Sequence, residues 1–100
     1  MLAANVLDGK TLLIDNFSVT TVDQRLILSL DADIEGKTYH IVFHNVSSLR
    51  IENISYPVQI SGFAVADHSA KGWQPDVRYE VYDYENGMIR FFCEEIAVSG

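Results

Sequence analysis

Two histidines and two aspartates are the first residues in this sequence that could do chemistry. His40 and His44 lie four positions apart in one predicted strand, and Asp31 and Asp33 lie in the strand before it. Each strand residue advances by about 3.3 Å, so the two histidines share a face but are roughly 13 Å apart. One metal ion cannot be held by both without a bend. The pattern therefore favours a solvated face of alternating charge over a metal or acid/base site.

A second candidate is the polar loop DHSAKGWQPD, from Asp67 to Asp76. Asp67, His68 and Asp76 could bind a small ligand or a divalent cation, as loop residues often do. Trp73 could stack on such a ligand, or its ring could instead cover an open end of the fold. Asp67, His68 and Ser69 are adjacent, so their side chains point apart, and the loop is not predicted to be a catalytic triad.

The third candidate is an acidic and aromatic hairpin, residues 78–98. Asn86-Gly87 predicts a two-residue type I′ turn, because both residues tolerate the positive φ angles that this turn requires. In that register Tyr82 opposes Phe91 and Val81 opposes Phe92. Neither face of the hairpin is then cleanly apolar or cleanly polar.

Tyrosine and charged side chains on one surface suit protein recognition. The alternative is that the glutamates are edge-strand charges that prevent aggregation. The residues predicted to contribute to a binding surface are Trp73, Tyr82, Tyr84, Glu85, Glu94 and Glu95.

Cys93 is the single cysteine and lies in an apolar strand pattern. A nucleophilic thiol needs a nearby base and a positive environment. Its neighbours Glu94 and Glu95 would raise a thiol pKa, so Cys93 is predicted to be structural. The sequence contains no glycine-rich phosphate loop, no CxxC pair and no EF-hand pattern, and it predicts no catalytic residue, no metal site and no cofactor.

Length and charge limit the classes of partner. One hundred residues with 48% apolar content predict a single domain, residues 1–100. The formal net charge is -7, which argues against nucleic acid or an anionic membrane as a direct partner. Basic proteins, cations and neutral ligands remain. The absence of a signal peptide or an apolar stretch of about 18 residues predicts a cytoplasmic protein.

Turn residues punctuate the chain every 8 to 12 residues or so, as in all-β proteins. The clearest alternation runs from Arg25 to Ile34, and its leucine-bearing face is predicted to pack on Tyr39, Ile41 and Phe43. Further predicted strands are 11–20, with a bulge at 15–16, then 38–46, 49–54 and 58–65, with a bulge or close approach at Gly62. About seven strands predict an antiparallel β-sandwich, with a small β-barrel as the alternative.

Three stretches carry a resemblance to a known group: HIVFHNVSSLRI, SGFAVADHS and RYEVYDYENGMIRFFCEEIAV. Together they resemble small cytosolic all-β bacterial proteins of unknown or immunity-type function, some encoded beside polymorphic toxin genes. The resemblance implies a stoichiometric inhibitor that binds a toxin. An acidic inhibitor would complement a basic nuclease toxin electrostatically.

The sequence thus predicts a non-enzymatic, acidic protein-interaction module, and the resemblance implies an immunity-type antagonist of a basic toxin. The alternative is a ligand- or cation-binding module that uses the 67–76 loop. Homodimerisation through an edge strand is left open.

Overall fold

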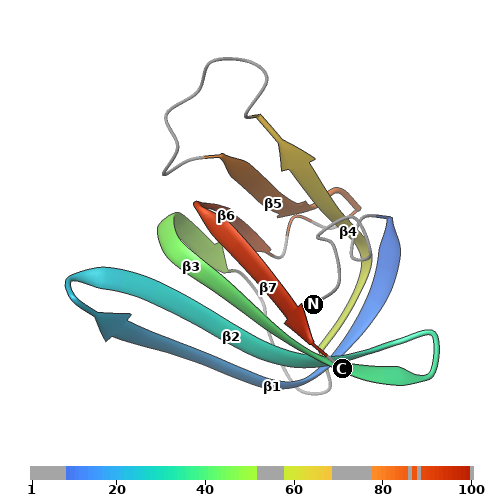
Figure 1. The fold of residues 1–100 in the computed structure, drawn as a ribbon. Helices are drawn as coiled ribbons and strands as arrows, with labels where there is room; N and C mark the ends of the chain where they lie inside the picture. Colours follow the sequence, from blue (N-terminus) through green and yellow to red (C-terminus); the bar gives the residue numbers. More distant parts are fainter. Residues whose placement is uncertain (1–8, 52–57, 69–77, 86, 88, 100) are drawn as a thin grey trace.

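The computed structural model describes residues 9–51, 58–68, 78–85, 87 and 89–99. They form an all-β fold, as predicted (Figure 1). The strands are β1 (Lys10–Val22), β2 (Arg25–Ile34), β3 (Lys37–Ile51), β4 (Val58–Asp67), β5 (Tyr79–Asp83), β6 (Ile89–Cys93) and β7 (Glu95–Ser99). No segment in this part of the chain is a helix long and apolar enough to cross a membrane.

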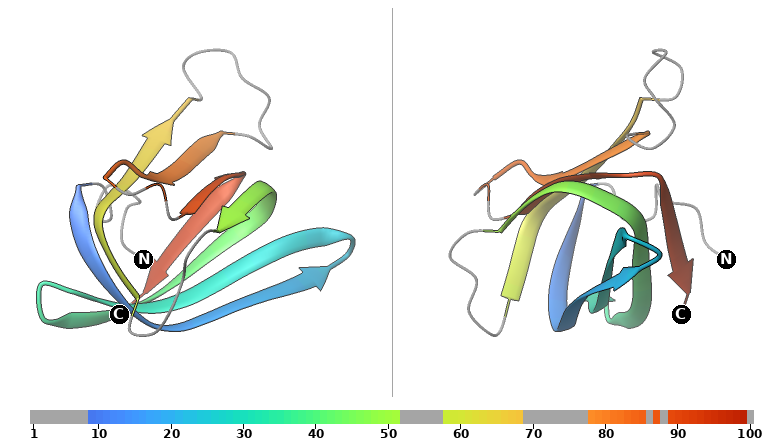
Figure 2. Two further views of the ribbon diagram at one scale, coloured as in Figure 1. Left: turned by 180° about the vertical axis from the view of Figure 1, so that it is seen from behind. Right: turned by 90° about the vertical axis from the view of Figure 1, so that its left-hand side faces the viewer.

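All strand pairs are antiparallel, and the strands form one sheet that closes on itself. Its order is β2-β1-β4-β5-β6-β3-β7, and β2 also pairs with β3, which completes the ring. Figure 2 shows the strands curving around a common interior. The predicted class and strand number are confirmed, and the closed sheet corresponds to the barrel alternative.

Strand β3 closes the sheet because it bends twice. One of its edges pairs with β2, and the other pairs first with β7 and then with β6. Asn45 and Ser48 both have a φ of 56°, and the register shifts beside each of them. These are β-bulges, which bend a strand and increase its twist. The predicted strand end at Ser47-Ser48 is therefore wrong, since a bulge carries the strand through it to Ile51.

The first two hairpins have two-residue turns with positive φ at both positions, as in type I′ turns. Asp23 and Gln24 have φ angles of 52° and 64°, and Glu35 and Gly36 have 54° and 84°. The second turn pairs Ile34 with Lys37. This register places the leucine face of β2 opposite the predicted face of β3, and the predicted core contact is confirmed.

Both predicted irregularities are confirmed. The β1–β2 register shifts between Ile14 and Asn16, where the bulge was expected. The β1–β4 register shifts on the β4 side around Gly62. A Cβ atom on Gly62 would lie 2.7 Å from the Glu85 Cγ atom, because the two backbones approach closely there.

The predicted register of the C-terminal hairpin is wrong by one residue. Val81 opposes Phe91 and Tyr82 opposes Arg90. The turn is longer than two residues, with Gly87 N donating to the Asp83 carbonyl oxygen at 3.1 Å. Because strand side chains alternate, a slip by one residue exchanges the two faces. The inner face carries Val81, Phe91 and Cys93 together with the buried Asp83, whereas Glu80 and Arg90 lie outside.

The core fills the interior of the closed sheet. Phe43 and Phe91 meet edge to face with their ring centroids 4.9 Å apart. The other fully buried large side chains come from β1 to β6 and include Leu12, Ile14, Leu28, Leu30, Ile41, Ile60, Phe63, Val81 and Ile89. The polar features that follow all lie outside this core.

Candidate functional site

A hollow lined mainly by charged and polar side chains lies where the β1–β2 hairpin tip approaches β3 and the break between β6 and β7. It is an open pocket of about 510 Å³, here called the acidic groove. Figures 1 and 2 show the hairpin tip and the start of β7 on the same side of the molecule. The groove is lined by Val22, Asp23, Arg25, Ile27, His44, Asn45, Glu94 and Glu95.

Three irregular backbone positions build the groove. Asp23 begins the type I′ turn between β1 and β2, and Asn45 is in a β3 bulge. Asp and Asn adopt positive φ more readily than most residues. Glu94 interrupts the strand between β6 and β7, and its N–H donates to the His44 carbonyl oxygen at 2.9 Å. The chain therefore turns polar side chains toward one hollow at positions where regular pairing is interrupted.

The groove has an excess of negative charge. Its lining has three carboxylates, from Asp23, Glu94 and Glu95, against the one guanidinium of Arg25. Asn45 Nδ2 donates to Glu94 Oε1 at 3.2 Å, and Arg25 Nη1 lies 3.7 Å from the same oxygen. These contacts hold Glu94 in place. Asp23 and Glu95 are exposed at the rim.

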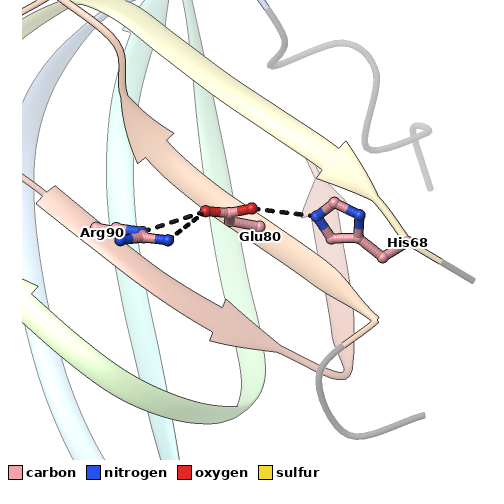
Figure 3. A network of polar contacts seen from close by, with 3 residues as sticks. All are labelled: His68, Glu80 and Arg90. Carbon is pink, nitrogen blue, oxygen red and sulfur yellow. Dashed lines mark hydrogen bonds and ion pairs between the residues drawn. The ribbon is translucent and has the colours of Figure 1, made fainter. Parts of the chain in front are cut away.

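A second polar cluster lies on the outer face of β5 and β6 (Figure 3). Arg90 donates to Glu80 Oε2 through Nη2 at 2.8 Å and Nε at 3.2 Å, and His68 Nε2 donates to Glu80 Oε1 at 3.1 Å. Burial by itself raises the pKa of Glu80, but the hydrogen bonds from His68 and Arg90 outweigh it and the pKa is lowered. Both Glu80 oxygens are bonded within the protein, so this cluster serves the structure.

The structure brings two of the predicted binding residues together, Glu94 and Glu95, in the acidic groove. Tyr84 and Glu85 are exposed in the turn before β6. They lie at the opposite end of β6 from Glu94, about 16 Å away at about 3.3 Å per residue. The predicted residues therefore occupy two separate parts of the surface.

Tyr82 lies on the outer face of β5, directly opposite Arg90. It is half-buried and lines a different pocket, of about 430 Å³, with Arg50 and Arg90. Trp73 lies outside the described residues.

The alternative ligand loop contributes two described residues, and both are bonded within the protein. Arg78 donates to both Asp67 oxygens, at 3.2 and 3.3 Å, and this raises the pKa of Arg78. His68 is buried against Glu80. Asp76 lies outside the described residues. No group of three or more His, Cys, Asp or Glu side chains suited to a metal ion occurs in residues 9–51, 58–68, 78–85, 87 and 89–99.

The histidines and aspartates of β2 and β3 form surface pairs. His40 Nδ1 lies 2.6 Å from Asp31 Oδ1, and this hydrogen bond lowers the pKa of Asp31. The Thr38 hydroxyl donates to Asp33 at 2.6 Å. His44 lies apart from them in the acidic groove. The arrangement fits the solvated face that the sequence favoured.

Cys93 is fully buried on the inner face of β6. Burial raises the pKa of its thiol to about 12, so it stays protonated at neutral pH. The structural interpretation of this cysteine is confirmed.

Sequence reasoning missed Asp23, Arg25 and Asn45 as groove residues. Asp23 lies in a turn, and a turn residue in the sequence does not reveal which distant segment lies beside it. The alternation of apolar and polar residues in β3 gives no indication that Asn45 has a positive φ. Only the pairing of β3 with β7 brings these residues to Glu94.

The family model described as "Immunity protein PIM8" matches residues 11–99. No curated protein and no solved structure matches the chain. The family match extends from the second residue of β1 to the end of β7, so it includes every described residue that lines the acidic groove.

Proposed function

This chain belongs to the PIM8 immunity protein family, and on that premise we propose that it is a non-enzymatic antagonist that binds a basic toxin through the acidic groove. The family match supports an immunity-type role in protein interaction. The basic character of the toxin and the position of the contact are our proposal.

The excess of carboxylates in the groove carries this proposal. Asp23, Glu94 and Glu95 face one hollow with only Arg25 to offset them, in a chain of net charge -7. A hollow of one charge sign attracts lysine and arginine side chains and accelerates encounter with a basic protein. The hydrogen bond from Asn45 and the ion pair with Arg25 orient Glu94 in advance, so less side-chain ordering is needed on binding.

Binding without catalysis agrees with the state of the reactive side chains. The Cys93 thiol is buried and protonated, and His68 is held by Glu80. A chain with a single cysteine suits the reducing cytoplasm, where we propose that it acts.

The test uses two double variants of equal net charge. Asp23→Asn/Glu95→Gln removes two carboxylates from the groove rim. Glu35→Gln/Glu85→Gln removes two exposed carboxylates elsewhere on the surface and is the matched control. Each protein is immobilised and used to capture basic proteins from a lysate of its source at low salt. The captured protein is then purified and assayed for toxicity with and without the wild-type chain.

We expect the wild type to capture a basic protein and to abolish its toxicity at a one-to-one ratio. Exposed charge pairs each contribute about 0.2 to 1 kcal/mol, so the groove variant should bind roughly 2- to 30-fold more weakly at low salt. The control variant should bind like the wild type, and high salt should reduce the difference. Equal weakening of the two variants would show that only the overall charge matters and would exclude the groove as the contact.

A further inference from the structure

The second half of β1 is paired on one side only. Residues 16–22 pair with β2, whereas the pairing of β1 with β4 ends at Ile14. Across the described ranges, no strand is hydrogen-bonded to the other side of residues 16–22, here called the open edge. Figure 1 shows this end of β1 extending with β2 beyond the rest of the sheet.

The hairpin register identifies which backbone groups face the open edge. Val22 and Arg25 flank the two-residue turn, and such a pair exchanges both of its hydrogen bonds. Bonded and non-bonded pairs then alternate along an antiparallel ladder. The N–H and C=O groups of Phe17, Val19 and Thr21 therefore point away from β2, toward the open edge.

The composition of the open edge favours pairing with another strand. Its sequence, NFSVTTV, has no charge and no proline, the two features that most often protect edges. Val19 is 40% exposed and Val22 is 51% exposed, so apolar surface accompanies the unpaired backbone. The edge leads directly into the acidic groove, because Val22 and Asp23 line the groove.

We infer that the open edge binds an extended segment of the toxin as an added strand, with a lysine or arginine of that segment entering the acidic groove. This inference rests on the proposed function and adds the mode of binding. Strand addition supplies affinity through main-chain hydrogen bonds, and the groove supplies selection for a basic side chain.

Charge makes a second copy of this chain a poor occupant. Antiparallel self-pairing centred on Val19 would place Asp15 of each copy opposite Asp23 of the other. Like charges directly opposite each other are destabilising, and each copy carries a net charge of -7. A basic strand meets the same two aspartates favourably.

The first measurement is residue-resolved amide hydrogen exchange of the wild-type chain, free and in complex with the purified basic protein described above. We expect new protection at the N–H groups of Phe17, Val19 and Thr21. Ser18 and Thr20 already donate to β2, so their protection should change less. Protection that rises evenly along residues 16–22, or not at all, would overturn the inference.

A variant pair provides the second measurement. Val19→Pro removes one outward N–H without removing a donor to β2, as proline at an open edge can. Val19→Thr keeps that N–H and the branched shape, and is the matched control. We expect Val19→Pro to weaken binding about tenfold and Val19→Thr to bind nearly as the wild type.

Thermal unfolding of each free variant checks the fold. If Val19→Pro does not fold, the hydrogen-exchange pattern of the wild-type complex alone tests whether the open edge binds the toxin. Recovery of no basic protein would overturn the proposed function and this inference together. A recovered toxin whose binding depends on Asp23 and Glu95 but leaves the open edge unprotected would overturn the inference alone.

Discussion

Glu80 accepts hydrogen bonds from His68 and Arg90. Replacing Glu80 by glutamine should show that its carboxylate makes a pH-dependent contribution to the free energy of unfolding. Its side chain is 18% exposed, and that of His68 is 10% exposed, so their contact is largely protected from water. Arg90 is 57% exposed, so its ion pair with Glu80 should stabilise the fold only as much as an exposed surface pair does, by about 0 to 1 kcal/mol. A hydrogen bond to a buried charged group contributes about 1.5 to 3 kcal/mol.

Glutamine keeps the shape of Glu80 and retains one acceptor oxygen, so part of this energy survives. We expect Glu80→Gln to lower the free energy of unfolding by about 1 to 2 kcal/mol at pH 7. For a chain of this length that corresponds to a fall in Tm of about 4 to 16 °C.

The pH dependence follows from the lowered pKa of Glu80. A carboxylate whose pKa is lower in the folded state stabilises the fold above its ordinary value of 4.5. That contribution is lost as the pH falls below 4.5 and through the lower folded value, because the wild-type side chain becomes protonated. The difference between wild type and Glu80→Gln should therefore shrink between pH 7 and pH 3.

Urea unfolding across this pH range is the assay, with Glu35→Gln as the control. Glu35 pairs with Lys10 at 3.0 Å on the open surface, so its loss should cost at most about 0.5 kcal/mol. A Glu80→Gln difference that is constant from pH 7 to pH 3, or no larger than that of Glu35→Gln, would refute the reasoning.

Two further predictions concern the core and the close approach at Gly62. Native protein should react with thiol reagents only as fast as it unfolds, because Cys93 is fully buried with a pKa of about 12; rapid labelling in native buffer would contradict this. Gly62→Ala should destabilise the fold by about 1 to 3 kcal/mol in thermal unfolding, since the added Cβ would lie 2.7 Å from Glu85 Cγ. Adding Glu85→Ala should recover part of that loss, and strictly additive effects would argue against the clash.

The sequence by itself determined the class of the fold and the inner face of its central strands. The alternation in RLILSLDADI and TYHIVFHNV fixes which side chains point inward, because strand side chains alternate at every residue. The bulge at 15–16 was visible as a change of phase. The family resemblance in the later strands agreed with the family match.

Turn signals were less dependable. Asn86-Gly87 is the strongest two-residue turn signal in the chain, yet the turn there is longer and the register moves by one. The two type I′ turns form instead at Asp23-Gln24 and Glu35-Gly36. The Asp83 carboxylate accepts from Glu85 N and its carbonyl from Gly87 N, so Asp83 favours the longer turn. The turn propensity of Asn86-Gly87 was outweighed by the register that pairs Val81 with Phe91 and buries both side chains.

Only the tertiary structure decided how the sheet closes and what the closure brings together. Alternation assigns faces within a strand, but it carries no information on which edges meet. The bulges of β3 allow one strand to pair with β2, β7 and β6, and they bring Asp23 beside Glu94 across most of the chain length. The same closure separates Glu94 from Tyr84 and leaves the open edge of β1 unpaired within the described chain, because pairing between distant segments depends on the whole fold.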